Sequence, residues 1–413
     1  MSKKKILIIL AEPIDNHTIL NTGAEYLKNF FEITFLLCTD WIWNLNKKNL
    51  EYNLEYISEN YGREFNFLKI VSFEDLEAKL ISINADFIFD CARNNFSKLI
   101  QDLAHKKKIK YVLINNGVLA SQNKNFYENC LNFFFKFKST LKNFLFNKKN
   151  YLNNSKPQKK KVTKNYLIKK IYNFLLKKFI PQKKYCDIAI LAGDAILNEY
   201  DLKKTRDICW VGSNDFYIFE KKKNNSLKKS DYILYIDSGF FESNIELRLL
   251  NIEYSFLDDE LKLFYNNFFE QVEKFLNLPV IIAGHRRGKN YKSYQNLFSS
   301  RELVFDKTAE LGAGSNLVLA NFTTAISFAV LNYKPILFFL NNKFKELELY
   351  SAMYFAARQL NSVSINVDTK IDLNKGILDV DINRYNLFKK NYIINNKVDS
   401  NVPFNSFIKK YEK

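Results

Sequence analysis

Residues 317–339 read LVLANFTTAISFAVLNYKPILFF, which is an apolar run, a short polar turn, a run with helical spacing and a second apolar run. The first and last runs have the length of buried strands, and residues 323–331 have the small side chains of a tightly packed helix. Parallel strands need such a crossover, because a tight turn joins only antiparallel strands. The stretch therefore predicts a strand–helix–strand unit of a parallel sheet.

The same alternation continues in both directions from this unit. The other expected strands are at 6–10, 33–37, 87–89, 111–114, 188–191, 209–211, 232–236, 280–283 and 303–305, and the other helical patterns are at 18–31, 96–103, 257–276 and 344–360. Strands that are apolar throughout and alternate with helices form parallel sheets covered on both faces. The sequence thus predicts an α/β protein.

A polar, lysine-rich stretch at 221–230 separates two halves of similar size. We interpret it as a domain linker and expect an N-terminal domain at 1–220 and a C-terminal domain at 221–413. Each half has enough strands for a Rossmann-like, doubly wound domain, and we expect the two domains to face a cleft with ligands at their strand ends. Residues 124–184 form a basic insertion in the first half, with interleaved lysines and aromatics and a single acid, Glu128.

The net charge of +18 points to anionic partners, which include nucleic acid, an anionic membrane surface and small anionic substrates. The five cysteines lie far apart, without the spacing of a metal or redox site, and this indicates free thiols in a reducing compartment. The N-terminal apolar run is too short for a signal peptide, and no run approaches the ~18 apolar residues of a membrane span. We expect a cytoplasmic protein.

Polar side chains follow three expected strands of the second half. They are Asp237, Ser238 and Gly239 after the strand at 232–236, Gly284, His285, Arg286 and Arg287 after the strand at 280–283, and Asn321, Thr323 and Thr324 after the strand at 317–320. Because the carboxyl ends of parallel strands meet at one edge of a sheet, these groups make the candidate site. The alternative for each group is structural, as a turn or helix cap, a solvated loop or a core histidine.

The residue types in these segments suit a phosphorylated ligand. Guanidinium groups match phosphate oxygens in pairs, and a helix capped by Asn321 or Thr323 would direct free N–H groups and a positive dipole end at a phosphate. The Asp237 carboxylate could act as a base or accept hydrogen bonds from sugar hydroxyls. We expect catalytic roles for Asp237 and His285, and donor binding by the other residues of the three segments.

Residues 280–340 resemble the nucleotide-binding half of GT-B glycosyltransferases that build bacterial surface polysaccharides, in particular capsule and lipooligosaccharide sialyltransferases and the polyol-phosphate transferases of teichoic acid synthesis. In those families one strand ends in a His-Pro pair, and a Ser or Thr pair opens a helix before a Lys-Pro strand. Here Arg286 stands in place of the proline, and Thr323 and Thr324 stand in place of two serines. The resemblance implies a GT-B-like fold, with His285 and both threonines at the donor phosphate and residues 237–239 near the donor.

Fewer signals mark the first half. Glu12, Asp15 and His17 follow the first strand, and Asn116 and Gly117 follow the strand at 111–114. Glu12 or Asp15 could be the catalytic base that activates an acceptor hydroxyl, whereas the alternative is capping of the helix that begins near residue 18. His17, Asn116 and Gly117 are candidates for the acceptor side.

The hypothesis is a glycosyltransferase that moves a sugar from a nucleotide-activated donor to a glycan or lipid-linked acceptor in capsule or lipopolysaccharide synthesis. The string Asp379-Val380-Asp381 lies in a late polar segment, so we expect no metal, and no cofactor apart from the nucleotide sugar as substrate. One alternative is polyol-phosphate transfer from a CDP-linked donor. Another is a nucleic-acid-binding protein, which the lysines and aromatics of 124–184 allow, although no RNA-binding motif is present and nucleic acid is not expected as a partner.

We expect residues 124–184 to dock the protein on the anionic inner face of the cell membrane. Lysines are attracted to anionic lipid, and interleaved aromatic and leucine side chains can enter the headgroup region. An ordinary helix of the first domain is the alternative.

Overall fold

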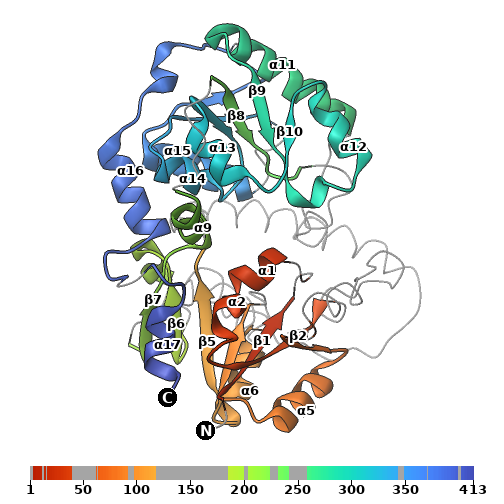
Figure 1. Cartoon of the computed structure of the whole chain (residues 1–413), viewed down its shortest axis with the longest axis vertical. Coiled ribbons are helices and arrows are strands. Elements are labelled where there is room, and N and C mark those ends of the chain that lie inside the picture. The colour runs from red at the N-terminus through yellow and green to blue at the C-terminus, as the bar shows by residue number, and fades with distance from the viewer. Residues whose placement is uncertain are drawn as a thin grey trace, which may run out of the picture. The chain divides into compact units, whose positions relative to one another are not determined.

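The computed structural model describes residues 3–11, 14, 16–39, 62, 64–91, 97–117, 185–199, 203–223, 231–240, 258–342, 348–369, 371–398 and 401–413. Two parallel sheets with helices packed on them make up this part of the chain (Figure 1).

The first sheet has seven parallel strands among the described residues, in the order β3-β2-β1-β4-β5-β6-β7. The strands are β1 (Lys5–Leu10), β2 (Glu32–Leu37), β3 (Asn66–Lys69), β4 (Phe87–Asp90), β5 (Lys110–Asn115), β6 (Ile188–Leu191) and β7 (Asp207–Trp210). This is the Rossmann order with one more strand, and the order reverses between β1 and β4.

Helices cover both faces of the first sheet. Leu10, Phe35 and their neighbours on one face pack against α1 (Asn16–Asn21), α2 (Ala24–Leu27) and the C-terminal α17 (Asn405–Tyr411). Leu7 and Ile9 on the other face pack against α5 (Phe73–Ile83) and α6 (Ser97–Lys106). Apolar side chains on both faces of β1 explain why this strand is an unbroken apolar run.

The second sheet has six parallel strands in the described part of the chain, in the order β10-β9-β8-β11-β12-β13. The strands are β8 (Ile233–Ile236), β9 (Val280–Ala283), β10 (Leu303–Val304), β11 (Leu317–Ala320), β12 (Ile336–Leu340) and β13 (Ser364–Asn366). The order is again that of a Rossmann fold, with its reversal between β8 and β11.

The helices of the second sheet share one apolar core with it. They include α11 (Asp258–Leu276), α12 (Lys292–Gln295), α13 (Thr308–Gly314), α14 (Ile326–Leu331), α15 (Glu348–Leu360) and α16 (Ile382–Phe388) (Figure 1). Aromatic rings fill much of this core; Tyr235 of β8 lies among Tyr265 and Phe269 of α11 and Phe339 of β12.

The expected fold class is confirmed, because both halves are parallel α/β sheets of doubly wound type. The cleft expected between the two domains stays a prediction. The helical pattern at 18–31 is two short helices, because the chain turns at Gly23 with a φ of 76°. A Cβ at Gly23 would lie 2.3 Å from the Phe404 ring, so no larger residue fits there.

The expectation that a helix opens at Asn321 or Thr323 is wrong. The helix α14 begins at Ile326 and has Ala325 as its N-cap residue. The Thr323 hydroxyl instead accepts a hydrogen bond from the Ala325 N–H over 3.2 Å, which holds the preceding residues in a turn. Threonine side chains make this local bond in competition with helix formation.

Two helices pack on the sheet of the other sequence half. Residues Phe216 and Tyr217 of α9 (Asn214–Lys222), which follows β7, belong to the core of the second sheet. Residues Phe407 and Ile408 of α17 belong to the core of the first sheet. The boundary expected near residue 220 stays a prediction, since residues 224–230 lie outside the described ranges.

Within the described residues, no helix is both long and apolar enough to cross a membrane. Four of the cysteines are described, at 38, 91, 186 and 209, and each is a free thiol. Burial raises the pKa of the Cys38, Cys186 and Cys209 thiols to about 12, so these three behave as small apolar groups rather than as nucleophiles.

Candidate active site

The expected groups of the second half meet at the carboxyl ends of three neighbouring strands. Asp237 follows β8, His285 follows β9 by way of Gly284, and Asn321 follows β11. The strands β9, β8 and β11 are adjacent in the sheet, and the reversal of strand order lies between β8 and β11. Ligands of open α/β sheets bind at this position of the fold.

The carboxylate of Asp237 lies at the centre of a hydrogen-bonded network. It is 4% exposed, and its Oδ1 accepts from the Tyr235 hydroxyl over 3.0 Å. Its Oδ2 accepts from the Gly239 N–H over 3.0 Å and from the Tyr294 hydroxyl over 2.7 Å. Both oxygens are therefore engaged by groups of the protein, as a buried carboxylate requires.

Burial raises the pKa of Asp237, and this outweighs His285 and the three hydrogen bonds, which lower it. Burial also raises the pKa of Tyr235 and of Tyr294. Neither hydroxyl therefore ionises near neutral pH, and each remains a hydrogen-bond donor to the carboxylate.

A second group of contacts joins the ends of β8 and β11. The Ser238 hydroxyl donates to Oδ1 of Asn321, and the Phe322 N–H donates to the Ser238 hydroxyl over 3.0 Å. The amide of Asn321 donates to the Tyr235 hydroxyl over 3.2 Å. Asn321 is thus a buried link between strand ends and does not cap a helix.

The basic loop after β9 contains a short 3-10 helix, Arg286–Gly288. His285, Arg286 and Arg287 are all partly exposed, although Nδ1 of His285, Nε of Arg286 and both terminal nitrogens of Arg287 are buried. The loop packs on the ring of Tyr294: a Cβ at Gly288 would lie 2.2 Å from it. The loop therefore keeps three basic side chains next to the strand ends.

The two threonines do not form the helix cap that the sequence predicts as a phosphate-binding site. Thr323 is partly exposed and Thr324 is exposed. The Thr324 carbonyl accepts from the Ser327 N–H and hydroxyl at 3.1 and 2.7 Å. With six residues, α14 is too short to direct a strong dipole at a phosphate, so the threonines can contribute only their own hydroxyl and backbone donors.

Tyr294, like Tyr235, is a residue of this site that the sequence did not reveal. It lies in α12, in a polar segment without a strand-end motif. Its hydroxyl accepts a hydrogen bond from the His285 N–H over 2.6 Å and donates to Asp237. The only sequence signal is the helical spacing of Tyr294, Leu297 and Phe298, which indicates a buried face but not a contact with the site.

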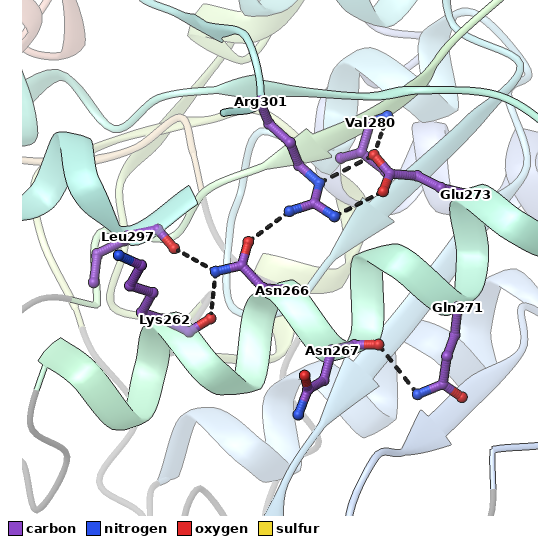
Figure 2. Close-up of polar contacts among 8 residues, drawn as sticks. All are labelled: Lys262, Asn266, Asn267, Gln271, Glu273, Val280, Leu297 and Arg301. Carbon is purple, nitrogen blue, oxygen red and sulfur yellow. Dashed lines mark hydrogen bonds and ion pairs between the residues drawn. The ribbon is translucent and has the colours of Figure 1, made fainter. Parts of the chain in front are cut away.

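A half-buried ion pair anchors the segment that carries Tyr294 (Figure 2). Arg301 binds both carboxylate oxygens of Glu273 in α11, at 3.0 and 2.7 Å, and donates to Asn266 over 2.5 Å. The amide of Asn266 donates to the Leu297 carbonyl over 3.2 Å, and Glu273 also accepts from the Val280 N–H at the start of β9. The segment from α12 to Arg301 is therefore fixed against both α11 and β9.

The first-half candidates are only partly described. Glu12 and Asp15 lie outside the described residues. His17 belongs to the helix α1, where the structure describes only its backbone. The Asn116 amide donates to the Asn21 carbonyl over 2.9 Å, whereas the space around Gly117 is open. The catalytic and acceptor roles expected for these five residues stay predictions.

The first sheet has a buried carboxylate that the sequence did not single out. Asp90 ends β4, beside the point at which the strand order reverses, and Oδ2 accepts from the Tyr111 hydroxyl over 2.6 Å. The lysine-rich insertion at 124–184 lies outside the described residues. Among the residues that are described, no group of His, Cys, Asp or Glu has the arrangement of a metal site.

No family model and no curated protein matches this chain. Similar solved structures include MurG of Acinetobacter baumannii (TM-score 0.45, 7% identity, covering 94% of each chain). They also include the wall teichoic acid polymerase TagF (0.44, 12%, covering 99% of this chain and 88% of that one) and the spinosyn forosaminyltransferase SpnP (0.43, 12%, covering 91% and 89%). At such scores these similarities carry no argument about activity.

The strand orders themselves define the class of protein. Two Rossmann-type sheets in one chain make it an α/β protein with two doubly wound, Rossmann-like halves. The particular reaction depends on the site.

Proposed function

We propose that this protein is a glycosyltransferase that uses a nucleotide-activated sugar. The observation that supports it is the partly exposed basic loop, His285, Arg286 and Arg287, at the strand ends beside the reversal of strand order in the second sheet. Guanidinium and imidazole groups at this position suit the phosphates of a nucleotide. The net charge of +18 agrees with an anionic substrate.

In the proposed reaction an acceptor hydroxyl attacks the anomeric carbon of the donor sugar. The bond from that carbon to the phosphate oxygen breaks, and its electron pair leaves with the nucleotide. The basic loop stabilises the negative charge that grows on the phosphate, and a carboxylate takes the acceptor proton. Glu12 and Asp15 are the candidates for that base, as the sequence predicts.

Asp237 has a different proposed role from the catalytic one expected from the sequence. Its oxygens already accept three hydrogen bonds and it is almost fully buried. A group so engaged holds the strand ends in place rather than exchanging a proton with substrate. The catalytic role of Asp237 stays a prediction. Its hydrogen bonds favour a role in positioning the strand ends.

The finer proposal is that the acceptor is a surface glycan or a lipid-linked glycan of capsule or lipopolysaccharide synthesis, with no metal required. The lysines and aromatics of 124–184 would hold the protein at an anionic membrane surface. Co-sedimentation with anionic and neutral vesicles at low and high salt tests this part. We expect salt-sensitive binding to anionic vesicles that falls when Lys169, Lys170, Lys177 and Lys178 become Gln.

Calorimetry with CMP, CDP, UDP, GDP and single-stranded RNA tests the proposed class. We expect one nucleotide to bind, and His285→Ala to weaken that binding by about 1–3 kcal/mol, the range of a hydrogen bond to a charged group. The matched control is His105→Ala, which removes a histidine paired with Asp187 in the first half and should leave the affinity unchanged.

Three outcomes, of the calorimetry and of an activity assay with nucleotide sugars and a CDP-linked polyol, would count against the proposal. Binding of RNA but of no nucleotide would favour the nucleic-acid alternative. Transfer of a polyol phosphate from a CDP-linked donor would favour the phosphotransferase alternative. Conversion of a nucleotide sugar without any transfer would exclude a transferase.

A further inference from the structure

One tyrosine hydroxyl joins the buried carboxylate of the site to the backbone of the basic loop. Tyr294 is 0% exposed. Its oxygen accepts from the His285 N–H over 2.6 Å and donates to Oδ2 of Asp237 over 2.7 Å. An N–H can only donate, so the Tyr294 oxygen accepts from His285 and its own proton is left to donate to the Asp237 carboxylate.

We propose that Tyr294 is the positioning residue of the nucleotide site, because it fixes the start of the loop that carries His285, Arg286 and Arg287. The part of this inference that concerns nucleotide affinity rests on the function proposed above. Tyr294 does not touch substrate in this assignment and acts through the loop backbone.

The Tyr294 hydroxyl acts together with other bonds of the loop backbone. Within the loop, the Gly288 N–H donates to the His285 carbonyl over 2.8 Å and the Tyr291 N–H donates to the Gly288 carbonyl over 2.9 Å. Near the two ends of the loop, the Gly284 N–H donates to the Val304 carbonyl over 2.8 Å, and the Gln295 amide donates to the Lys289 carbonyl over 2.8 Å. The bond to Tyr294 and the contact between Gly288 and the Tyr294 ring hold the residues in between, which include His285.

Tyr294 is itself held from two directions. Oδ2 of Asp237 fixes its hydroxyl from the end of β8. The contacts of Figure 2 fix its backbone segment, through Asn266 to Leu297 and through Arg301 to Glu273. Its ring packs edge-on against Phe298 at a centroid distance of 5.5 Å. Rotation of the ring away from the loop would break these contacts together. The contacts with α11 and β8 therefore hold the ring in place beside the loop.

The experiment compares Tyr294→Phe with Tyr232→Phe. Both changes remove one buried hydroxyl that is bonded to the backbone, because the Tyr232 hydroxyl donates to the Leu311 carbonyl over 2.7 Å. Tyr232 precedes β8, so it lies at the opposite end of the strand that Asp237 follows. A general loss of stability should therefore affect both variants, whereas loss of loop position should affect only Tyr294→Phe.

Two readouts are measured on the full chain. Hydrogen–deuterium exchange of peptides covering residues 284–291 should be at least tenfold faster in Tyr294→Phe than in Tyr232→Phe or the unmodified protein. The affinity for the nucleotide that the unmodified protein binds best, among CMP, CDP, UDP and GDP, should fall about tenfold in Tyr294→Phe alone, equal to about 1.4 kcal/mol.

The two readouts separate the positioning role from the proposed function. Equal exchange in the two variants overturns the positioning role, whatever the nucleotide result. Faster exchange with unchanged affinity also overturns it, because the loop would then not locate the ligand. If the unmodified protein binds none of the nucleotides, the proposed function fails and the affinity part of the inference fails with it, while exchange alone still decides whether Tyr294 holds the loop. If Tyr294→Phe does not fold, Asp237→Asn serves as the second variant. It weakens the bond between Asp237 and the Tyr294 hydroxyl while the Tyr294 ring stays in place, and it must give the same faster exchange of residues 284–291.

Discussion

Replacing Arg301 by Met should destabilise the protein by about 2–4 kcal/mol. Loss of one partner of a buried ion pair costs about 3–5 kcal/mol, whereas an exposed pair contributes about 0–1 kcal/mol. The Arg301 side chain is 10% exposed and that of Glu273 is 25% exposed, so this pair lies closer to the buried case. Met keeps the apolar stem over the Phe269 ring, where the guanidinium now lies 5.3 Å from the centroid.

A double-mutant cycle with Glu273→Gln isolates the ion pair from the other contacts. Urea denaturation is followed by circular dichroism, because all three tryptophans, at 41, 43 and 210, belong to the first half and would report on the second sheet only if both halves unfold together. We expect a coupling energy of about 1–3 kcal/mol. The control is Lys289→Met, which breaks an exposed pair with Asp306 in the same half of the chain and should cost under about 1 kcal/mol.

A cost for Arg301→Met no larger than that of Lys289→Met would refute this reasoning. The same holds for a coupling energy near zero, since the contacts of Figure 2 would then contribute no more than a surface pair.

Further changes test other parts of the structure. Burial raises the pKa of Asp215 in α9 to about 6, so its contribution to stability is present below about pH 4 and is lost as pH rises through 6. This rise in pKa corresponds to at most ~3 kcal/mol of stability, and partial exposure of the side chain reduces that value. In urea titrations, Asp215→Asn should therefore gain stability relative to the parent between pH 4.5 and 7.5. A loss of stability over this range would contradict the prediction. Asp237→Asn should gain stability relative to the parent as pH rises, in the same way, because burial raises that pKa as well. It should melt within a few degrees of the parent and lower transferase activity at least tenfold, about 1.4 kcal/mol of barrier. An equally active variant would mean that Asp237 is only a turn residue. Gly288→Ala should destabilise the protein by about 1–3 kcal/mol and speed exchange of the loop, because its Cβ would lie 2.2 Å from the Tyr294 ring; exchange at the parental rate would mean that the loop can move away without cost.

The sequence by itself determined the elements and one edge of the site. Buried parallel strands are apolar on both faces, so β1, β8, β9, β11 and β12 appear as unbroken apolar runs that need no knowledge of their neighbours. Polar residues directly after such runs must lie at the carboxyl edge of the sheet, and this placed Asp237, His285 and Asn321 together before any contact was known. Two of the strands with exposed or half-buried residues, β3 and β13, gave no such pattern and were missed.

Only the tertiary structure decided how these pieces pair and what each polar group does. The strand order within each sheet depends on contacts between residues far apart in the chain, which no local pattern encodes. The packing of Phe407 on the first sheet joins residues about 400 positions from β1, for the same reason. A local preference was overridden at Thr323, whose hydroxyl holds a turn instead of opening the helix. Tyr294 shows most clearly what the sequence does not predict. A tyrosine can lie on any buried face of a helix, and only the approach of α12 to the ends of β8 and β9 makes the Tyr294 hydroxyl the bridge between Asp237 and His285.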